Sequence, residues 1–110
     1  MKAVEVPHDA FVVRLETHEA RMCDRLLARA IDAVMTGRAK AIVFEIGRRA
    51  MSGCIATAMQ DWMDRYAMVI RENVDMMIFV APSTLAWLAL KLDFVGKRPP
   101  APYVVVRRKP

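Results

Sequence analysis

The sequence predicts an α/β fold: one domain with a mixed, mostly parallel sheet covered by helices. The chain has 110 residues, of which 55% are hydrophobic and 26% charged, which suits a single domain, residues 1–110, with a substantial core. Short apolar runs of strand length alternate with longer segments of helical periodicity. Such alternation predicts right-handed crossovers and parallel pairing, in the order β-β-α-β-α-β-α-β.

The first third of the chain predicts a hairpin followed by a long helix. Residues 2–6 and 10–16 are β-rich runs separated by the turn formers of "PHD", so they predict an antiparallel pair. From Thr17, a plausible N-cap, the pattern becomes helical, and Gly37 suits the end of this helix. The apolar stripe expected to face the sheet consists of Met22, Leu26, Ala30, Ala33 and Val34, widened by Cys23, Leu27 and Ile31.

The remaining elements follow the same alternation. The run "AIVFEI", residues 41–46, predicts a strand covered on both faces. Residues 53–72 predict one helix with Met59 and Met63 in its apolar stripe, and "DMMIFVA" predicts a third strand. A shorter helix is expected over residues 82–92, entered through Pro82 and Ser83 or Thr84. The proline-rich residues 94–102 predict a loop, residues 103–106 an edge strand, and residues 107–110 a basic tail.

The stretch "RRAMSGCIA", residues 48–56, is the polar corner where the second helix begins. Ser52 is a good N-cap, and capping contributes about 1 kcal/mol to a helix without any modification. The same helix start offers N–H groups and a positive dipole end to a phosphate, and Arg48 and Arg49 add charge-assisted bonds. A plain cap and a phosphorylated Ser52 are therefore both open readings of the corner.

This corner and the order of elements resemble STAS domains, which occur in anti-sigma-factor antagonists, in stressosome proteins and at the ends of sulfate transporters. In that family a buried strand with an acidic end leads to an Asp-Ser-Ser-Gly or Asp-Ser-Thr-Gly corner that opens a helix. Here Glu45 is the acidic residue, Ser52 falls on the phosphoacceptor position and Gly53 on the glycine. Ala50 and Met51 depart from the family pattern. The stretch "DMMIFVAPSTLAWLALKL" is similar to the fourth strand and third helix of STAS domains, including the STAS/SEC14-like branch.

The resemblance implies a non-enzymatic protein-interaction module in bacterial signalling. Its partner, such as a regulatory kinase-like or anti-sigma-like protein, would bind at the corner through Arg48, Arg49, Met51, Ser52 and Gly53. Met68 falls on the polar face of the second helix and indicates a partner contact or a homodimer. No apolar run is long enough to span a bilayer, no signal peptide is recognisable and only two cysteines occur, so we expect a cytoplasmic protein.

Two other functions compete with the interaction module. The Met-rich interior and the "LAWLALKL" helix favour a carrier of a small apolar ligand. An enzyme would use Cys54, because a thiol in the first turn of a helix can have a lowered pKa, but a small buried core cysteine is the favoured interpretation. The net charge of +5 lies mostly in the tail without interleaved aromatic residues, so specific nucleic-acid binding is not expected. No metal-ligand set, cofactor or catalytic residue is predicted, and Glu45 is expected to pair with an arginine.

Overall fold

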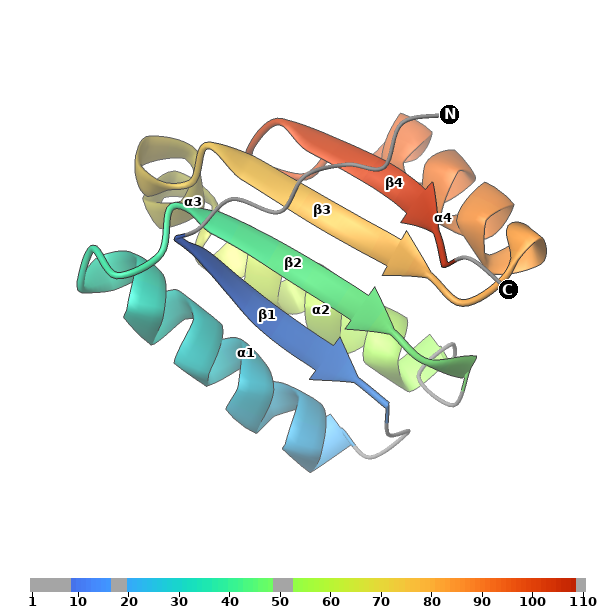
Figure 1. Cartoon of the computed structure of the whole chain (residues 1–110), viewed down its shortest axis with the longest axis horizontal. Coiled ribbons are helices and arrows are strands. Elements are labelled where there is room, and N and C mark those ends of the chain that lie inside the picture. The colour runs from blue at the N-terminus through green and yellow to red at the C-terminus, as the bar shows by residue number, and fades with distance from the viewer. Residues whose placement is uncertain (1–8, 17–19, 49–52, 109–110) are drawn as a thin grey trace.

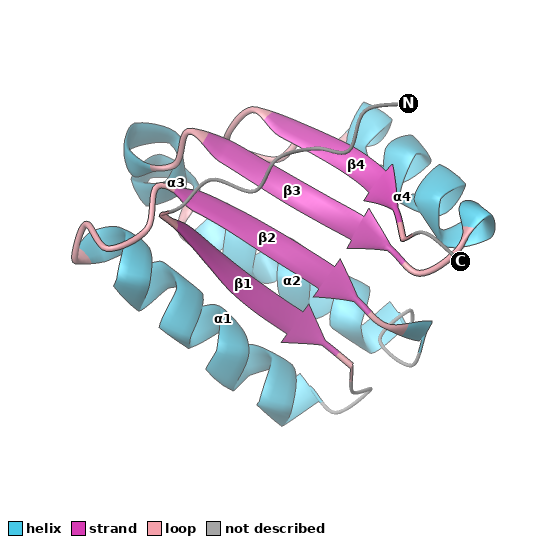
Figure 2. Cartoon of the chain, in the orientation of Figure 1, coloured by secondary structure: helices cyan, strands magenta, loops and turns pink. Residues whose placement is uncertain are grey.

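The described residues form four strands and four helices. The computed structural model describes residues 9–16, 20–48 and 53–108, and within them the sheet is entirely parallel with the order β1-β2-β3-β4 (Figure 2). The predicted α/β class is confirmed, while the strand predicted for residues 2–6 lies outside the described residues. The elements in chain order are β1 (Ala10–Leu15), α1 (Ala20–Met35), β2 (Ala41–Ile46), α2 (Gly53–Arg65), α3 (Ala67–Asn73), β3 (Met76–Ala81), α4 (Thr84–Gly96) and β4 (Tyr103–Arg107).

All four helices lie on the same face of the sheet (Figure 1). This arrangement follows from the strand order, because each strand pairs with the next one in sequence and right-handed crossovers then place every connection on one side. The register aligns Val13 with Phe44, Phe44 with Phe79, and Phe79 with Val105, so one row of side chains crosses the sheet beneath the helices.

An aromatic cluster occupies the centre of that row. The Phe44 and Phe79 rings are stacked with centroids 4.9 Å apart, and the Trp62 ring on α2 meets Phe44 edge-on at 5.8 Å. The Phe94 ring on α4 lies 4.8 Å from Phe79 and 5.2 Å from Tyr103 at the start of β4. The cluster therefore joins three strands to both α2 and α4.

The buried side of α1 differs by about one residue from the predicted stripe. Met22 is 46% exposed, whereas Cys23, Leu27 and Ile31 are buried, so the prediction that Met22 faces the sheet is wrong. These three residues, which were expected only to widen the stripe, therefore lie at the centre of the buried side. The sequence pattern did not separate them from their neighbours, because neighbouring positions on a wide apolar face look alike. Gly37 ends the helix region with a φ of 77°, a conformation that favours glycine.

Two other helix boundaries also differ from the prediction. The region expected as one helix is divided at Tyr66, whose φ of −109° and ψ of 22° depart from helical values without a glycine or proline nearby. The last helix continues to Gly96 instead of ending near Leu92. Burial of Phe94 against Phe79 and Tyr103 stabilises this extra turn, and the prolines that predicted a loop begin only at position 99.

The face of the sheet opposite the helices is also apolar at its centre. Val12, Val43, Ile78 and Val104 stand side by side in the register, and β2 is buried on both faces, as predicted. Beside this row the Arg14 Nε lies 3.1 Å from a Glu45 carboxylate oxygen on the neighbouring strand. The expected pairing of Glu45 with an arginine is therefore confirmed.

Replacing Phe79 by leucine tests the importance of the aromatic cluster. Phe79→Leu keeps an apolar side chain but removes ring contacts with Phe44, Phe94 and Tyr103, and we expect the free energy of unfolding to fall by about 2 kcal/mol. Urea unfolding measures this change. Met35→Leu, at a residue that is 64% exposed on α1, is the control and should change stability by less than about 0.5 kcal/mol. Equal effects of the two substitutions would contradict the central role of Phe79.

Candidate functional site

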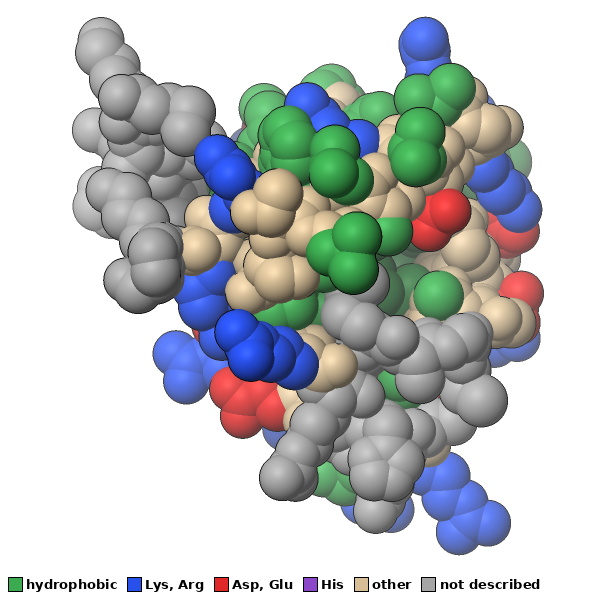
Figure 3. Space-filling model, turned by 90° about the vertical axis from the view of Figure 1, so that its right-hand side faces the viewer, with side chains coloured by type: hydrophobic (Ala, Val, Ile, Leu, Met, Phe, Trp, Pro, Cys, Tyr) green, Lys and Arg blue, Asp and Glu red, His purple; other side chains and the backbone are tan. Residues whose placement is uncertain are grey.

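The carboxyl ends of the four strands meet at one edge of the sheet, which we call the carboxyl edge. The arrowheads in Figure 1 point to it, and Figure 3 views the molecule from that side. Four segments lie there, at or directly after the ends of the strands: Glu16, Gly47–Arg48, Pro82–Thr84 and Arg107–Arg108. Both α2 and α4 begin at the same edge. Parallel sheets bind their ligands outside the carboxyl ends of the strands, so this edge is the candidate site.

Gly47 brings the segment that leads into the corner close to the end of β1. Its backbone N–H donates to the Leu15 carbonyl oxygen at 2.8 Å. A Cβ atom at position 47 would lie 3.2 Å from both the Glu16 Cα and the Leu15 oxygen, which are backbone atoms. Glycine is therefore favoured here, because a larger residue would need the two backbones to separate by a few tenths of an ångström.

The predicted corner residues are only partly described. Arg48 is exposed directly after Gly47, and Gly53 is the first residue of α2. Arg49, Met51 and Ser52 lie outside the described residues, so the alternatives of a plain cap and a phosphorylated serine both stay predictions. The structure does bring Arg48 and the start of α2 to the carboxyl edge, where the corner was expected.

Met68 does not belong to this edge. It lies on α3, which precedes the start of β3 at the opposite end of the strands (Figure 1), and it is 70% exposed. Its predicted exposure is confirmed. Met68 and Arg48 are therefore at opposite ends of the sheet and cannot form one continuous small site.

Arg107 and Arg108 add positive charge to the carboxyl edge. The Arg108 backbone N–H donates to the Ala81 carbonyl oxygen at 2.8 Å, and this bond holds the chain after β4 beside the end of β3. The Arg107 Nη1 donates to the Thr84 hydroxyl at 3.2 Å, and its Cζ lies 5.3 Å from the centre of the Trp87 ring. The sequence pattern assigned these arginines to a tail. Because parallel strands end at the same edge of a sheet, recognising residues 103–106 as a parallel strand would have placed Arg107 and Arg108 near Arg48.

Trp87 covers the outer side of the edge strand. Its indole N–H donates to the Val105 carbonyl oxygen at 2.9 Å, and the Lys91 ammonium lies 4.4 Å from the centre of its ring. A carbonyl on the free side of an edge strand would otherwise be open to another strand. Trp87 thus stabilises β4 and fixes the side of α4 that faces this strand.

The carboxyl edge carries more positive than negative charge. Within residues 9–16, 20–48 and 53–108, the three ion pairs are Arg14–Glu45, Arg38–Asp32 and Lys97–Asp64. None of these pairs includes Arg48, Arg107 or Arg108, and Glu16 is the only carboxylate among the four segments that follow the strands. The arginines are available to an anionic group, with which guanidinium forms charge-assisted hydrogen bonds.

The two cysteines lie on different helices. Cys23 is fully buried on α1, and this burial, with a smaller contribution from the Asp24 carboxylate, raises the pKa of its thiol from 9.0 to about 11. A thiol with such a pKa is protonated at neutral pH and is not a nucleophile. Cys54 lies in the first turn of α2, and its side chain is outside the described part of the structure.

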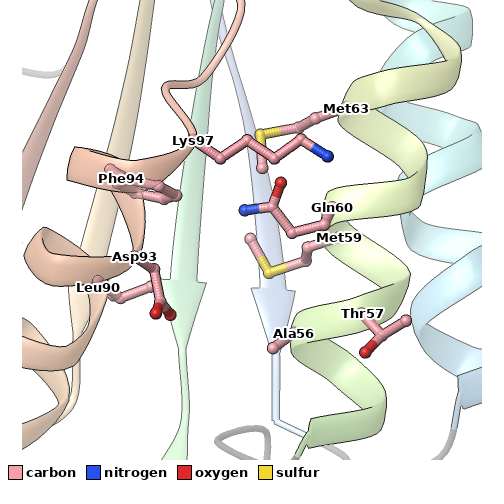
Figure 4. A pocket seen from close by; sticks show the side chains of 9 residues that line it. All are labelled: Ala56, Thr57, Met59, Gln60, Met63, Leu90, Asp93, Phe94 and Lys97. Atoms are coloured by element: carbon pink, nitrogen blue, oxygen red, sulfur yellow. The ribbon is translucent and has the colours of Figure 1, made fainter.

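A groove of about 390 Å³ separates α2 from α4 on the helical side of the sheet (Figure 4). Met59, Met63 and Phe94 form its apolar floor, and Gln60, Asp93 and Lys97 lie along its rim. Lys97 is also held 2.6 Å from an Asp64 oxygen. Met59 and Met63 are only 6% and 4% exposed, so the predicted core positions are confirmed and the floor offers little apolar surface to a ligand.

The described ranges contain neither a metal-binding cluster nor a membrane-spanning helix. No three histidine, cysteine or acidic side chains in those ranges come together in a way that would hold a metal ion. None of the described helices has the length and apolar character needed to cross a membrane.

Substitution of Gly47 tests the backbone approach at the carboxyl edge. Gly47→Ala should lower the free energy of unfolding by about 1–3 kcal/mol, because the added methyl group meets backbone atoms of Leu15 and Glu16. Thermal or urea unfolding provides the measurement. Gly96→Ala is a matched control, since a Cβ there meets nothing within 4 Å. A loss of stability in Gly96→Ala as large as in Gly47→Ala would contradict this account.

The buried thiol of Cys23 predicts a loss of stability at high pH. Between pH 9 and 11 the unfolded chain releases the thiol proton while the folded chain retains it, so the free energy of unfolding falls as pH rises. We expect wild type to lose roughly 2 kcal/mol more than Cys23→Ala over this range. Urea unfolding at several pH values measures the difference. Identical pH profiles for the two proteins would show that the thiol titrates normally.

Comparison with protein-family models, curated proteins and solved structures found no match to this chain. Since a fold by itself does not determine a function, the residues at the carboxyl edge and their geometry are the evidence for what the protein does.

Proposed function

We propose that the chain is a non-enzymatic protein-interaction module of the STAS-like kind, which binds an acidic surface of a partner protein at the carboxyl edge. The single observation that carries this proposal is the set of arginines without carboxylate partners among the described residues: Arg48, Arg107 and Arg108. They lie at or directly after the ends of two different strands of the same sheet. The resemblance to STAS domains favours a role in bacterial signalling, with an anti-sigma-like or kinase-like protein as partner.

The chemistry of the carboxyl edge suits binding better than catalysis. Guanidinium groups form strong hydrogen bonds to anionic groups, so a cluster of arginines suits the binding of an acidic surface. The Thr84 hydroxyl is engaged by Arg107. Cys23 is buried within α1 with its thiol protonated, which leaves Cys54 as the basis of the enzymatic alternative.

A phosphate on Ser52 would act on this edge through charge. Phosphorylation adds nearly two negative charges at neutral pH. Placed before Gly53 at the start of α2, these charges would neutralise the arginines and repel an acidic partner surface. The proposed switch therefore has a direction: the unmodified protein binds and the phosphorylated protein releases.

A carrier of a small apolar ligand is the second candidate, favoured by the groove between α2 and α4. Its volume of about 390 Å³ would accept a small ligand. Nearly complete burial of Met59 and Met63, however, leaves little apolar area for a ligand to cover. The interaction module remains the better supported function.

Charge reversal at Arg48 tests the proposed function. Affinity capture with the full chain from its native host, followed by quantitative mass spectrometry, should enrich a partner that Arg48→Glu binds about tenfold more weakly. Arg65→Glu carries the same change in charge at the exposed C-terminal end of α2 and should bind like wild type. Ser52→Asp should weaken the same partner, whereas Ser52→Ala should retain it.

Three outcomes would contradict the proposal. They are the absence of any specifically enriched protein, equal capture by wild type and Arg48→Glu, and equal loss in Arg48→Glu and Arg65→Glu. A stoichiometric lipid in native mass spectra of freshly purified protein would favour the carrier instead.

A further inference from the structure

The outer side of α4 carries an exposed aliphatic stripe, formed by Leu85, Leu88, Leu92 and Val95. Their exposed fractions are 80%, 46%, 72% and 80%. The other large exposed hydrophobic residues of the described chain are dispersed over β1, α1 and α3. Figure 3 shows hydrophobic side chains gathered over α4 in the upper part of that view. Isolated exposed apolar residues are common, but a continuous stripe of this kind marks an interaction surface.

The stripe has no role in packing α4 against its own sheet. Ala86 and Phe94 are the buried residues of the helix, and the Phe94 ring contacts Phe79 on β3 and Tyr103 on β4. The four stripe residues lie on the opposite side of the helix at 100° per residue. A helix that is apolar on both sides is normally covered on both sides.

The spacing of the stripe residues indicates that another helix packs against them. Positions 85, 88, 92 and 95 are separated by three, four and three residues, which is the repeat by which two helices interlock side chains along a seam. This spacing reads the same in both directions and is centred on position 90. An identical helix related by a two-fold axis would therefore set Leu85 opposite Val95 and Leu88 opposite Leu92 of the second copy.

We propose that the protein forms a two-fold symmetric dimer in which the α4 helices of two copies pack antiparallel through this stripe. The partner is a second copy because its α4 presents the matching spacing and side chains of similar size at every position. Each copy would bury a few hundred Å² of apolar surface, and the doubled area lies at the lower end of specific interfaces. The dimer is accordingly in exchange with monomer at micromolar concentrations.

The residues flanking the stripe permit this close packing. Ala89 and Gly96 lie seven positions apart on one flank, and a Cβ added at Gly96 would meet nothing within 4 Å. On the other flank the Lys91 ammonium lies over the Trp87 ring, which itself bonds to β4. The lysine charge is thereby directed toward the edge strand and away from the seam.

The dimer leaves the proposed partner site accessible. Because α4 begins at the carboxyl edge, antiparallel α4 helices turn the carboxyl edges of the two copies in opposite directions. Each copy then binds one partner, giving two separate sites per dimer. The dimer depends on α4 alone and does not rest on the function proposed for Arg48.

Sedimentation velocity between about 1 and 200 µM tests the dimer, since weak interfaces exchange in this range. Wild type should shift from monomer to dimer, and Leu88→Lys/Leu92→Lys should stay monomeric, a weakening of about 100-fold or more. Met22→Lys/Met35→Lys adds the same charge at two other exposed residues, both on α1, and should dimerise like wild type. Circular dichroism should show all three proteins folded, because the changed side chains are exposed.

Cysteine cross-linking tests the antiparallel arrangement. In chains with Cys23→Ala and Cys54→Ser, a mixture of Leu88→Cys and Leu92→Cys proteins should cross-link faster than either protein alone. A monomeric wild type over the whole range, or a dimer unaffected by Leu88→Lys/Leu92→Lys, would overturn the proposal. Faster cross-linking of each variant with itself would show parallel helices and exclude the two-fold pairing described above.

Discussion

The stack of Phe44 on Phe79 is the contact on which the rest of the molecule depends. These rings lie on adjacent central strands with a 9° angle between their planes, and each ring also contacts an aromatic side chain on a helix. Phe44 meets Trp62 on α2, and Phe79 meets Phe94 on α4. A domain of this size has one small core, so a single aromatic cluster that joins three strands and two helices determines how α2 and α4 sit on the sheet. Their position in turn determines the groove between them and the surface that α4 presents outward.

The strand order determines which surfaces are left for function. Because each strand pairs in parallel with the next strand in sequence, every described helix lies on one face of the sheet and the carboxyl end of every strand lies at one edge. Arg48, Arg107 and Arg108 therefore come to the same edge, although about 60 residues separate the first from the other two. The last helix lies at the end of the row and covers the last strand, so no other described helix packs against its outer side. The charged edge and the aliphatic stripe are two distinct surfaces, one suited to an acidic partner and the other to a second copy.

Most elements could be predicted from the sequence, whereas several boundaries and facing residues could not. The apolar run at residues 41–46 predicted a buried strand, and Ser83 was a recognisable entry to α4, where its hydroxyl accepts the Ala86 N–H at 3.2 Å. On α1 only Met22 was wrongly assigned to the buried side, because several neighbouring positions are apolar and only contact with the sheet selects among them. The helix break at Tyr66 could not be predicted, because no glycine or proline lies near it in the sequence. For the candidate site, Arg48 was predicted, but the contribution of Arg107 and Arg108 depended on knowing which strands lie side by side.

By itself the sequence determined the α/β class, the alternation of strands and helices, and the polar corner at which α2 begins. These features depend on local periodicity, on caps and on turn residues, which act over a few positions of the chain. Only the tertiary structure decided that the helices share one face, that arginines distant in sequence meet at one edge, and that the stripe on α4 stays exposed. The "LAWLALKL" segment reads equally well as buried core and as interface, because hydrophobic periodicity does not say what covers each side of a helix. That distinction is made by the packing of Phe94 against Phe79 and Tyr103, which commits one side of α4 to the core and leaves the other to solvent or a partner.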